Sequence, residues 1–246
     1  MHENESAPRE RVLIAGGSSG MGLALAGALL EDGAEVTIVG RSEARLAEAR
    51  RRLPDTGRLR ACAADITCED EVAGLFGQSG PLDHIAVTAA DIEGAYQLLP
   101  ALELTAVRRA IDSKLVGPLL LAKHGAAVLA PRGSITFTSG IAAYRPTARG
   151  AAVAAVNGAL AALVRALAVE LGPVRVNAVS PGWVDTPIWT YVAGEAKDAM
   201  LGAMAERLPV GRVGRAEEIA DAIRFLMGNG FVTGTVLHVE GGHRLV

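Results

Sequence analysis

A group of glycines near the amino terminus has the spacing of a phosphate-binding turn. Gly16, Gly20 and Gly22 lie between a short apolar run and a helix-forming stretch that begins at Leu23. Because glycine has no Cβ, the backbone can turn tightly there and approach a ligand closely. A helix that begins at such a turn offers free N–H groups and the positive end of its dipole to phosphate oxygens. We therefore expect a dinucleotide pyrophosphate at this turn, in preference to a glycine-rich turn without a ligand.

The residues after the strand expected at 36–39 indicate which dinucleotide binds. An acidic residue about 20 positions beyond the glycines normally holds the 2′-hydroxyl of the adenosine ribose. This chain has Gly40 and Arg41 at that point. A guanidinium favours a dianionic 2′-phosphate, whereas a carboxylate would repel it. The sequence therefore favours NADP(H) over NAD(H); the alternative is that Arg41 is a solvated charge at the start of a loop.

Short β-rich segments alternate with longer helical segments along the chain. Strands are expected at 12–14, 36–39, 59–63, 85–87, 135–138, 174–176 and 236–239. Helices are expected at 22–31, 43–53, 104–129, 151–171 and 216–227. Alternation of this kind predicts an α/β fold with a doubly wound parallel sheet, the Rossmann fold, which would position the turn and Arg41 at one edge. We expect a single domain at 11–246 after a polar tail at 1–10.

Composition excludes several other classes of protein. The chain has 246 residues, half of them apolar, and a formal net charge of -3, so it lacks the clustered basic face that nucleic-acid binding needs. Cys62 and Cys68 are too few for a disulfide framework, and neither has histidine neighbours at metal-ligand spacing. The first residues are polar and acidic, unlike a signal peptide, and no run of about 18 uncharged apolar residues predicts a membrane span. We expect a cytoplasmic protein without a bound metal.

Several further segments resemble the short-chain dehydrogenase/reductase family, over nearly the whole chain. They are Asp65-Ile66, Ser139 at the end of a strand, the stretch 175–182, Thr186, and Glu240-Gly241-Gly242. The resemblance implies hydride transfer between a nicotinamide and a carbonyl or alcohol, a substrate lid around 183–212, and a homodimer or homotetramer. It implies a cofactor-binding set of Gly16, Ser18, Ser19, Gly20, Met21, Gly22, Arg41, Asp65, Ile66, Ala89, Asn157, Pro181, Gly182, Val184 and Thr186.

The catalytic pair that the family carries is absent at the matching positions. The family uses Tyr-x-x-x-Lys, in which the lysine charge lowers the pKa of the tyrosine. Counting back without a gap from Leu167–Leu171, which matches the end of the family's helix, gives Val153 and Asn157 at the two positions. Valine has no proton to give, and Asn157 can bond a ribose hydroxyl but carries no charge.

Three other residues are candidates for the missing chemistry. Lys114 replaces a family asparagine and falls on or beside a buried helical stripe. We expect its ammonium either to enter the active-site cleft or to reach solvent, with the aliphatic part of the side chain lying along the protein surface. Tyr144, in the loop after Ser139, is either a displaced proton donor or, as we favour, a residue that shapes the pocket. The predicted catalytic set is therefore Ser139, Lys114, Tyr144 and Asn157.

The resulting hypothesis is an NADP(H)-dependent oxidoreductase with a noncanonical site. Its substrate would be a small carbonyl, alcohol or imine-like compound, because an iminium or activated alkene needs little help from an acid. One alternative is a non-redox enzyme on the same scaffold that catalyses a cyclisation, dehydration or isomerisation. Another is a catalytically silent cofactor-binding subunit, against which the retention of Ser139 and Thr186 argues weakly.

Overall fold

A parallel sheet forms the centre of the computed structural model, which describes residues 9–246. Its seven strands have the spatial order β3-β2-β1-β4-β5-β6-β7, and every neighbouring pair is parallel. The strands are β1 (Arg11–Ala15), β2 (Glu35–Gly40), β3 (Leu59–Ala63), β4 (Leu82–Val87), β5 (Leu129–Thr138), β6 (Arg175–Pro181) and β7 (Val236–Val239). This topology confirms the predicted α/β Rossmann fold. The expected tail at 1–10 lies mostly outside the described residues.

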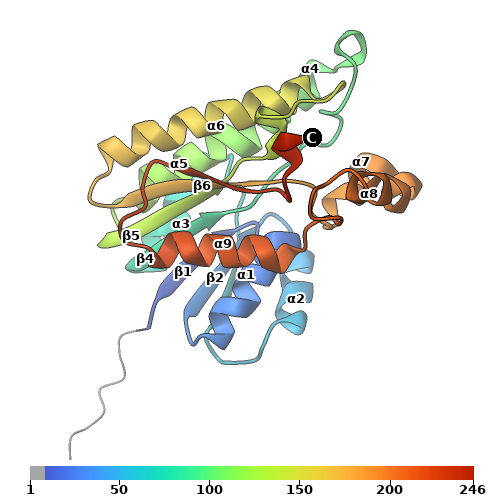
Figure 1. Cartoon of the computed structure of the whole chain (residues 1–246). Coiled ribbons are helices and arrows are strands. Elements are labelled where there is room, and N and C mark those ends of the chain that lie inside the picture. The colour runs from blue at the N-terminus through green and yellow to red at the C-terminus, as the bar shows by residue number, and fades with distance from the viewer. Residues whose placement is uncertain (1–8) are drawn as a thin grey trace, which may run out of the picture.

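Helices cover both faces of the sheet (Figure 1). They are α1 (Gly20–Glu31), α2 (Glu43–Arg52), α3 (Glu69–Ser79), α4 (Leu104–Ile111), α5 (Gly117–Gly125), α6 (Ala151–Glu170), α7 (Ile188–Ala193), α8 (Lys197–Ala205) and α9 (Ala216–Gly228). On one face, α1, α2 and α9 bury strand residues such as Ile14 and Ile38. On the other face, α3, α5 and α6 pack over Leu13, Ile85 and Phe137. Strands with apolar side chains on both faces are thus buried from both sides, as parallel sheets require.

The helix expected at 104–129 is divided into three parts. A π-helical turn, Asp112–Val116, separates α4 from α5, and β5 begins at Leu129, where the helix was expected to end. Pro118 explains the interruption, because a proline has no N–H to donate to the carbonyl one turn earlier, and its ring crowds that carbonyl. The prediction of one continuous helix was therefore wrong. Helix α3 was not predicted, although Val72, Leu75 and Phe76 form its buried stripe.

The carboxyl ends of the strands meet at one edge of the sheet. The direction in which successive strands are added to the sheet reverses between β1 and β4. Strand β1 lies between β2 and β4, so the connections after β1 and β4 leave toward opposite faces. In open α/β sheets this reversal creates a crevice at the carboxyl ends of the strands, and ligands bind there. The glycine-rich turn, Arg41 and Ser139 follow β1, β2 and β5 respectively, and so all lie along this edge.

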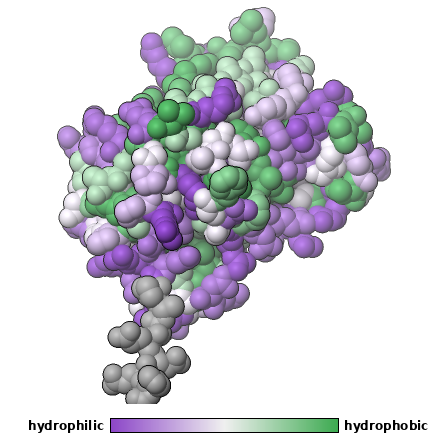
Figure 2. Space-filling model, turned by 60° about the vertical axis from the view of Figure 1, so that its left-hand side comes forward, coloured by the Kyte–Doolittle hydropathy of each residue, from purple (hydrophilic) through white to green (hydrophobic). Residues whose placement is uncertain are grey.

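Helix α6 is long and apolar enough, by length and composition alone, to cross a membrane. Among the described residues it is the one helix that meets this criterion. It packs against the sheet through Leu160, Val164 and Leu167, so burial in the core accounts for the apolar residues on this face of the helix. On the face shown in Figure 2, hydrophobic patches are interrupted by hydrophilic residues and do not form a continuous band.

Candidate functional site

The glycine-rich turn leads directly into α1, whose first turn faces the crevice. The N-cap residue is Ser19, whose side chain makes no capping hydrogen bond, and the N–H of Leu23 is the first to bond back, to the carbonyl of Ser19. The preceding N–H groups, those of Gly20, Met21 and Gly22, have no acceptor within their own helix. Such donors, at the positive end of the helix dipole, suit a pyrophosphate.

Two of the glycines are required by the packing of the turn. Gly16 has a φ of +92°, and a Cβ on it would lie 2.4 Å from the backbone nitrogen of Ala89. A Cβ on Gly22 would lie 2.4 Å from the carbonyl oxygen of Gly16. The hydroxyl of Thr88 donates to this same carbonyl at 3.2 Å and so ties the turn to the end of β4. The glycine-rich turn therefore packs directly against the backbone of Ala89.

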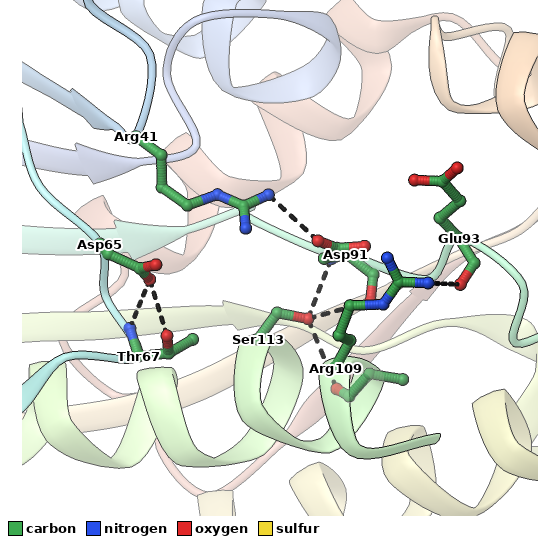
Figure 3. A network of polar contacts seen from close by, with 8 residues as sticks. Arg41, Asp65, Thr67, Asp91, Glu93, Arg109 and Ser113 are labelled. Atoms are coloured by element: carbon green, nitrogen blue, oxygen red, sulfur yellow. Dashed lines mark hydrogen bonds and ion pairs between the residues drawn. The ribbon is translucent and has the colours of Figure 1, made fainter. Parts of the chain in front are cut away.

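Arg41 has a carboxylate partner that the sequence analysis did not identify. Its Nη2 lies 3.1 Å from Oδ2 of Asp91, which follows β4, and the two side chains point toward one another in Figure 3. The Arg41 side chain is 62% exposed and that of Asp91 only 18%, so the arginine is neither buried nor simply solvated. Ser18 lies close by, because a Cβ on Gly40 would be 3.6 Å from its hydroxyl.

Asp65 and Ile66, two residues of the predicted cofactor-binding set, make contacts within the protein. The carboxylate of Asp65 accepts hydrogen bonds from the N–H and hydroxyl of Thr67, at 2.9 and 2.8 Å (Figure 3). Ile66 is buried, and its side chain packs so closely on Gly117 that a Cβ there would approach it to 2.8 Å. Their role toward a cofactor stays a prediction.

The segment after β6 reaches back to the start of α1. A Cβ on Gly20 would lie 3.5 Å from the side chain of Thr186, which is itself buried. Pro181 ends β6, and the N–H of Gly182 bonds to the carbonyl of Val239 on β7. Val184 is buried in the core. Thr186 is thus placed beside the helix start that we expect to hold the phosphates.

Helices α7 and α8 stand away from the sheet at the same edge (Figure 1). Trp189 anchors this part, because its Nε1 donates to the carbonyl of Val184 at 2.8 Å and its ring stacks on that of Trp183. Lys197 forms an ion pair of 2.7 Å with Asp185. Their action as a substrate lid stays a prediction.

Three of the four predicted catalytic residues come together where β5 ends. The hydroxyl of Ser139 donates to the main-chain carbonyl of Asn157, on α6, at 3.1 Å. The Nζ of Lys114 donates to the carbonyls of Thr138 and Ser139, at 3.2 and 3.3 Å. Ser139, Lys114 and Asn157 are 4%, 7% and 2% exposed, so the cluster is shielded from bulk water.

Lys114 therefore turns inward instead of extending to solvent. It belongs to the π-helical turn, a feature found frequently at functional sites. Both of its hydrogen-bond acceptors are neutral carbonyls, and burial lowers the pKa of its ammonium to about 8. Close by, Oδ1 of Asn157 and Oγ1 of Thr138 are buried without a hydrogen-bond partner among the described residues. Buried polar atoms normally have a hydrogen-bond partner, so these two oxygens are available to accept or exchange a hydrogen bond with a bound molecule.

Val153 lies one helical turn before Asn157 and is buried in a small apolar cluster with Ala95 and Ala110. Tyr96 packs against this cluster, near Gly150, where α6 begins. Burial raises the pKa of the Tyr96 phenol, so it stays protonated at neutral pH. Tyr96 was not predicted from the sequence, although a phenol in the irregular segment after β4 was a signal that could have identified it.

Tyr144 does not join the cluster around Lys114 through any contact that we observe among the described residues. It is 40% exposed, and its ring meets that of His238, on β7, edge-on at 4.4 Å between centroids. The favoured view that Tyr144 shapes a pocket stays a prediction. In the described part of the chain, no group of three or more histidine, cysteine or acidic side chains could hold a metal ion. Cys62 and Cys68 are both free.

Known proteins resemble this chain over almost its whole length. The family model described as enoyl-(acyl carrier protein) reductase matches residues 15–244. The short-chain dehydrogenase/reductase ucsE of Acremonium sp is 36% identical, with 95% of both chains aligned. The solved MalC reductase/Diels-Alderase from Malbranchea aurantiaca is 31% identical, has a TM-score of 0.89 and aligns over 97% of this chain and 98% of its own. A small-chain dehydrogenase solved in complex with NADPH is 33% identical, with a TM-score of 0.80 and coverage of 97% and 100%.

Proposed function

The chain belongs to the short-chain dehydrogenase/reductase family, and from this premise we propose that it is an NADP(H)-dependent oxidoreductase with a noncanonical active site. Its substrate would be a small carbonyl, alcohol or imine-like compound. The observation that carries the proposal is the buried ammonium of Lys114, 3.3 Å from the carbonyl of Ser139. It supplies a cationic group beside Asn157, where the family's lysine is expected and an amide stands.

The residues present fit NADP(H). The N–H groups at the start of α1 would hold the pyrophosphate, Thr186 lies beside them, and Arg41 would take the 2′-phosphate. The unpartnered Oδ1 of Asn157 could accept a hydrogen bond from a ribose hydroxyl. When bound, the cofactor supplies or accepts the hydride. A solved relative that binds NADPH supports this choice of cofactor.

The choice of substrate follows from the missing tyrosine. Losing a positioned general acid typically costs a factor of about 10²–10⁴ in rate. An iminium or activated alkene accepts a hydride with little need for a proton, so such compounds tolerate this loss best. For a carbonyl, a proton must come from another group. Tyr96 is the candidate we favour, because it is protonated and packs against the cluster that contains Val153.

The direct test follows NADPH absorbance with a panel of cyclic imines, aldehydes and ketones. We expect oxidation with at least one class, reduced at least tenfold in Ser139→Ala and in Lys114→Met. Lys123→Met is the matched control, because Lys123 lies on α5 but is exposed and pairs with Glu69. Equal loss in Lys123→Met, or wild-type rates in both site variants, would contradict the proposed site.

A second candidate function is a non-redox reaction on the same scaffold. A solved relative is described as both a reductase and a Diels-Alderase, which supports a cyclisation as the alternative reaction. A cyclisation or isomerisation would consume substrate, measured by mass spectrometry, without any net change in NADPH absorbance. A silent subunit would bind NADPH, turn over neither substrate class and co-purify with an active relative. A cytoplasmic location and a homodimer or homotetramer stay predictions.

A further inference from the structure

The Arg41–Asp91 ion pair crosses the crevice in which we expect the cofactor. Arg41 follows β2 and Asp91 follows β4, and β1 lies between these two strands. Neighbouring strands are about 4.8 Å apart, so the pair spans two strand spacings, roughly 10 Å, at the carboxyl end of β1. The glycine-rich turn leaves the sheet at this same point. The adenosine half of a dinucleotide occupies this part of the crevice in such folds.

The two partners differ in how many contacts hold them in place. The hydroxyl of Ser113, in the π-helical turn, accepts from the N–H of Asp91 at 2.9 Å and donates to its carbonyl at 3.2 Å (Figure 3). Arg109 holds the next part of this loop, by donating to the carbonyl of Glu93 at 3.0 Å. The backbone of Asp91 is therefore fixed from α4 and the π-helical turn. The Arg41 side chain is long and mostly exposed, so we expect it to be the partner that changes position when a ligand enters.

We propose that Asp91 is a determinant of cofactor affinity, because its carboxylate competes with the 2′-phosphate of NADP(H) for the guanidinium of Arg41. This inference rests on the proposed function. NADPH brings its own anion, which replaces the carboxylate as the partner of Arg41. NADH brings no such anion, so the ion pair must open for it without a replacement contact. The carboxylate thus weakens binding of both cofactors, and Arg41 restores affinity for NADPH alone.

The size of the effect follows from the exposure of the pair. A partly exposed ion pair contributes enough free energy to change a dissociation constant by about two- to fivefold. Loss of a charge-assisted contact to the 2′-phosphate is larger, about tenfold or more. Removing the carboxylate should therefore tighten both cofactors slightly. Removing the guanidinium should weaken NADPH strongly.

The test is a double-mutant cycle measured by titration calorimetry with NADPH and with NADH. We expect Asp91→Asn to lower the Kd of both cofactors by about two- to fivefold. In an Arg41→Ala background, the same Asp91→Asn change should leave the NADH Kd unaltered, because no ion pair remains to be opened. The amide keeps the shape of the side chain, and the Ser113 bonds involve only the backbone of Asp91, so the loop should keep its structure.

Glu93→Gln is the matched control, because it removes the same charge from an exposed position of the same loop. An equal gain in Glu93→Gln, no gain in Asp91→Asn, weaker NADH binding in Asp91→Asn, or a gain that persists without Arg41 would each overturn the inference. Failure of the proposed function looks different: the wild-type protein would then bind no NADPH. If NADPH binds and Arg41→Ala weakens it while Asp91→Asn changes nothing, the cofactor assignment stands and the competition does not.

Discussion

Lys114 keeps a positive charge in a place where charge is costly. Its ammonium is buried, its two acceptors are neutral carbonyls, and its pKa falls to about 8 because of burial. Removing an ion from water disfavours the charged form. The residue therefore lies close to neutralisation at physiological pH, which a surface lysine never does. A site that needs a cation near Ser139 would work only below this pKa.

The pH dependence of turnover tests this role. We expect kcat/KM with an imine or carbonyl substrate to fall as pH rises through about 8, because Lys114 loses its proton there. Lys114→Met should be slower than the wild type below about pH 8, where Lys114 is charged, and should lack this descending limb, so that the two profiles converge at higher pH. Profiles recorded from pH 6 to pH 10 at saturating NADPH check both points. The same limb in Lys114→Met would assign the titration to another group.

Tyr96 makes a second prediction for a single side chain. Its phenol keeps its proton because burial raises its pKa, and it packs against the cluster that contains Val153. If it delivers the proton to a carbonyl substrate, Tyr96→Phe should lower kcat by about 100-fold or more, with NADPH affinity unaltered. Reduction of an iminium should lose much less. A larger loss in Tyr144→Phe than in Tyr96→Phe would make Tyr144 the donor instead.

Sequence patterns predicted single residues well where the signal was local. Gly16 and Gly22 stand where their backbone leaves no space for a Cβ, and Lys114 takes the inward of the two positions that its place beside a buried stripe allowed. The partners of these residues were not predictable in the same way. Asp91 lies fifty positions from Arg41, and Tyr96 reaches the start of α6 from a different loop. Contacts between such distant residues cannot be predicted from local spacing, because they depend on the order of the strands in the sheet.

At the scale of elements, the glycine-rich turn combines two separate demands. Gly16 needs a positive φ, and its backbone also approaches Ala89 too closely for any side chain. Gly33 has nearly the same φ, +93° against +92°, but in the described part of the chain no atom lies within 4 Å of the position that a Cβ would take. A side chain at Gly33 would therefore strain only the backbone conformation, whereas a side chain at Gly16 would strain the backbone and also collide with Ala89.

The substitutions Gly16→Ala and Gly33→Ala measure the two costs. Gly33→Ala should lower the free energy of unfolding by about 1 kcal/mol, through backbone strain alone, and leave NADPH binding unchanged. Gly16→Ala should lower it by about 2 kcal/mol or more and abolish measurable binding, because the turn must shift away from β4. Urea unfolding and calorimetry give both quantities. Equal costs in the two variants would show that the close approach to Ala89 is not maintained in solution.

Alternating apolar segments predicted the elements of the sheet, and the strands at 59–63 and 236–239 have the expected bounds. The connection between β4 and β5 was harder. Its 104–129 segment has a continuous helical pattern, yet it contains a π-helical turn that positions Ser113 and Lys114 toward the crevice and the end of β5. Periodicity cannot reveal a single extra residue in a helix. Pro118 was the one local sign of the break.

For the molecule as a whole, the edge of the sheet that holds the candidate site also lowers the stability of the folded protein. The core on each face is apolar and closely packed, whereas the crevice edge holds a buried ammonium and polar atoms that have no hydrogen-bond partner among residues 9–246. Folding must bury these groups whether or not a ligand is present. The cost should appear as a pH dependence of global stability, because unfolding returns Lys114 to water.

The sign of this dependence follows from the two pKa values of Lys114. The pKa is about 8 in the folded protein and 10.5 as the ordinary value, so between these limits the unfolded chain binds more protons and stability rises with pH. Below about pH 8 the full penalty is present, and above about pH 10.5 it is absent. The shift corresponds to about 3 kcal/mol. The free energy of unfolding of the wild type, relative to Lys114→Met, should therefore increase by about this amount from pH 7 to pH 10.5, measured by urea titration at each pH.

Lys123→Met, at an exposed site, should show no such difference. A wild-type protein that tracked Lys114→Met at every pH would mean that water reaches the ammonium in the folded state, and the shielded site at the end of β5 would have to be reconsidered.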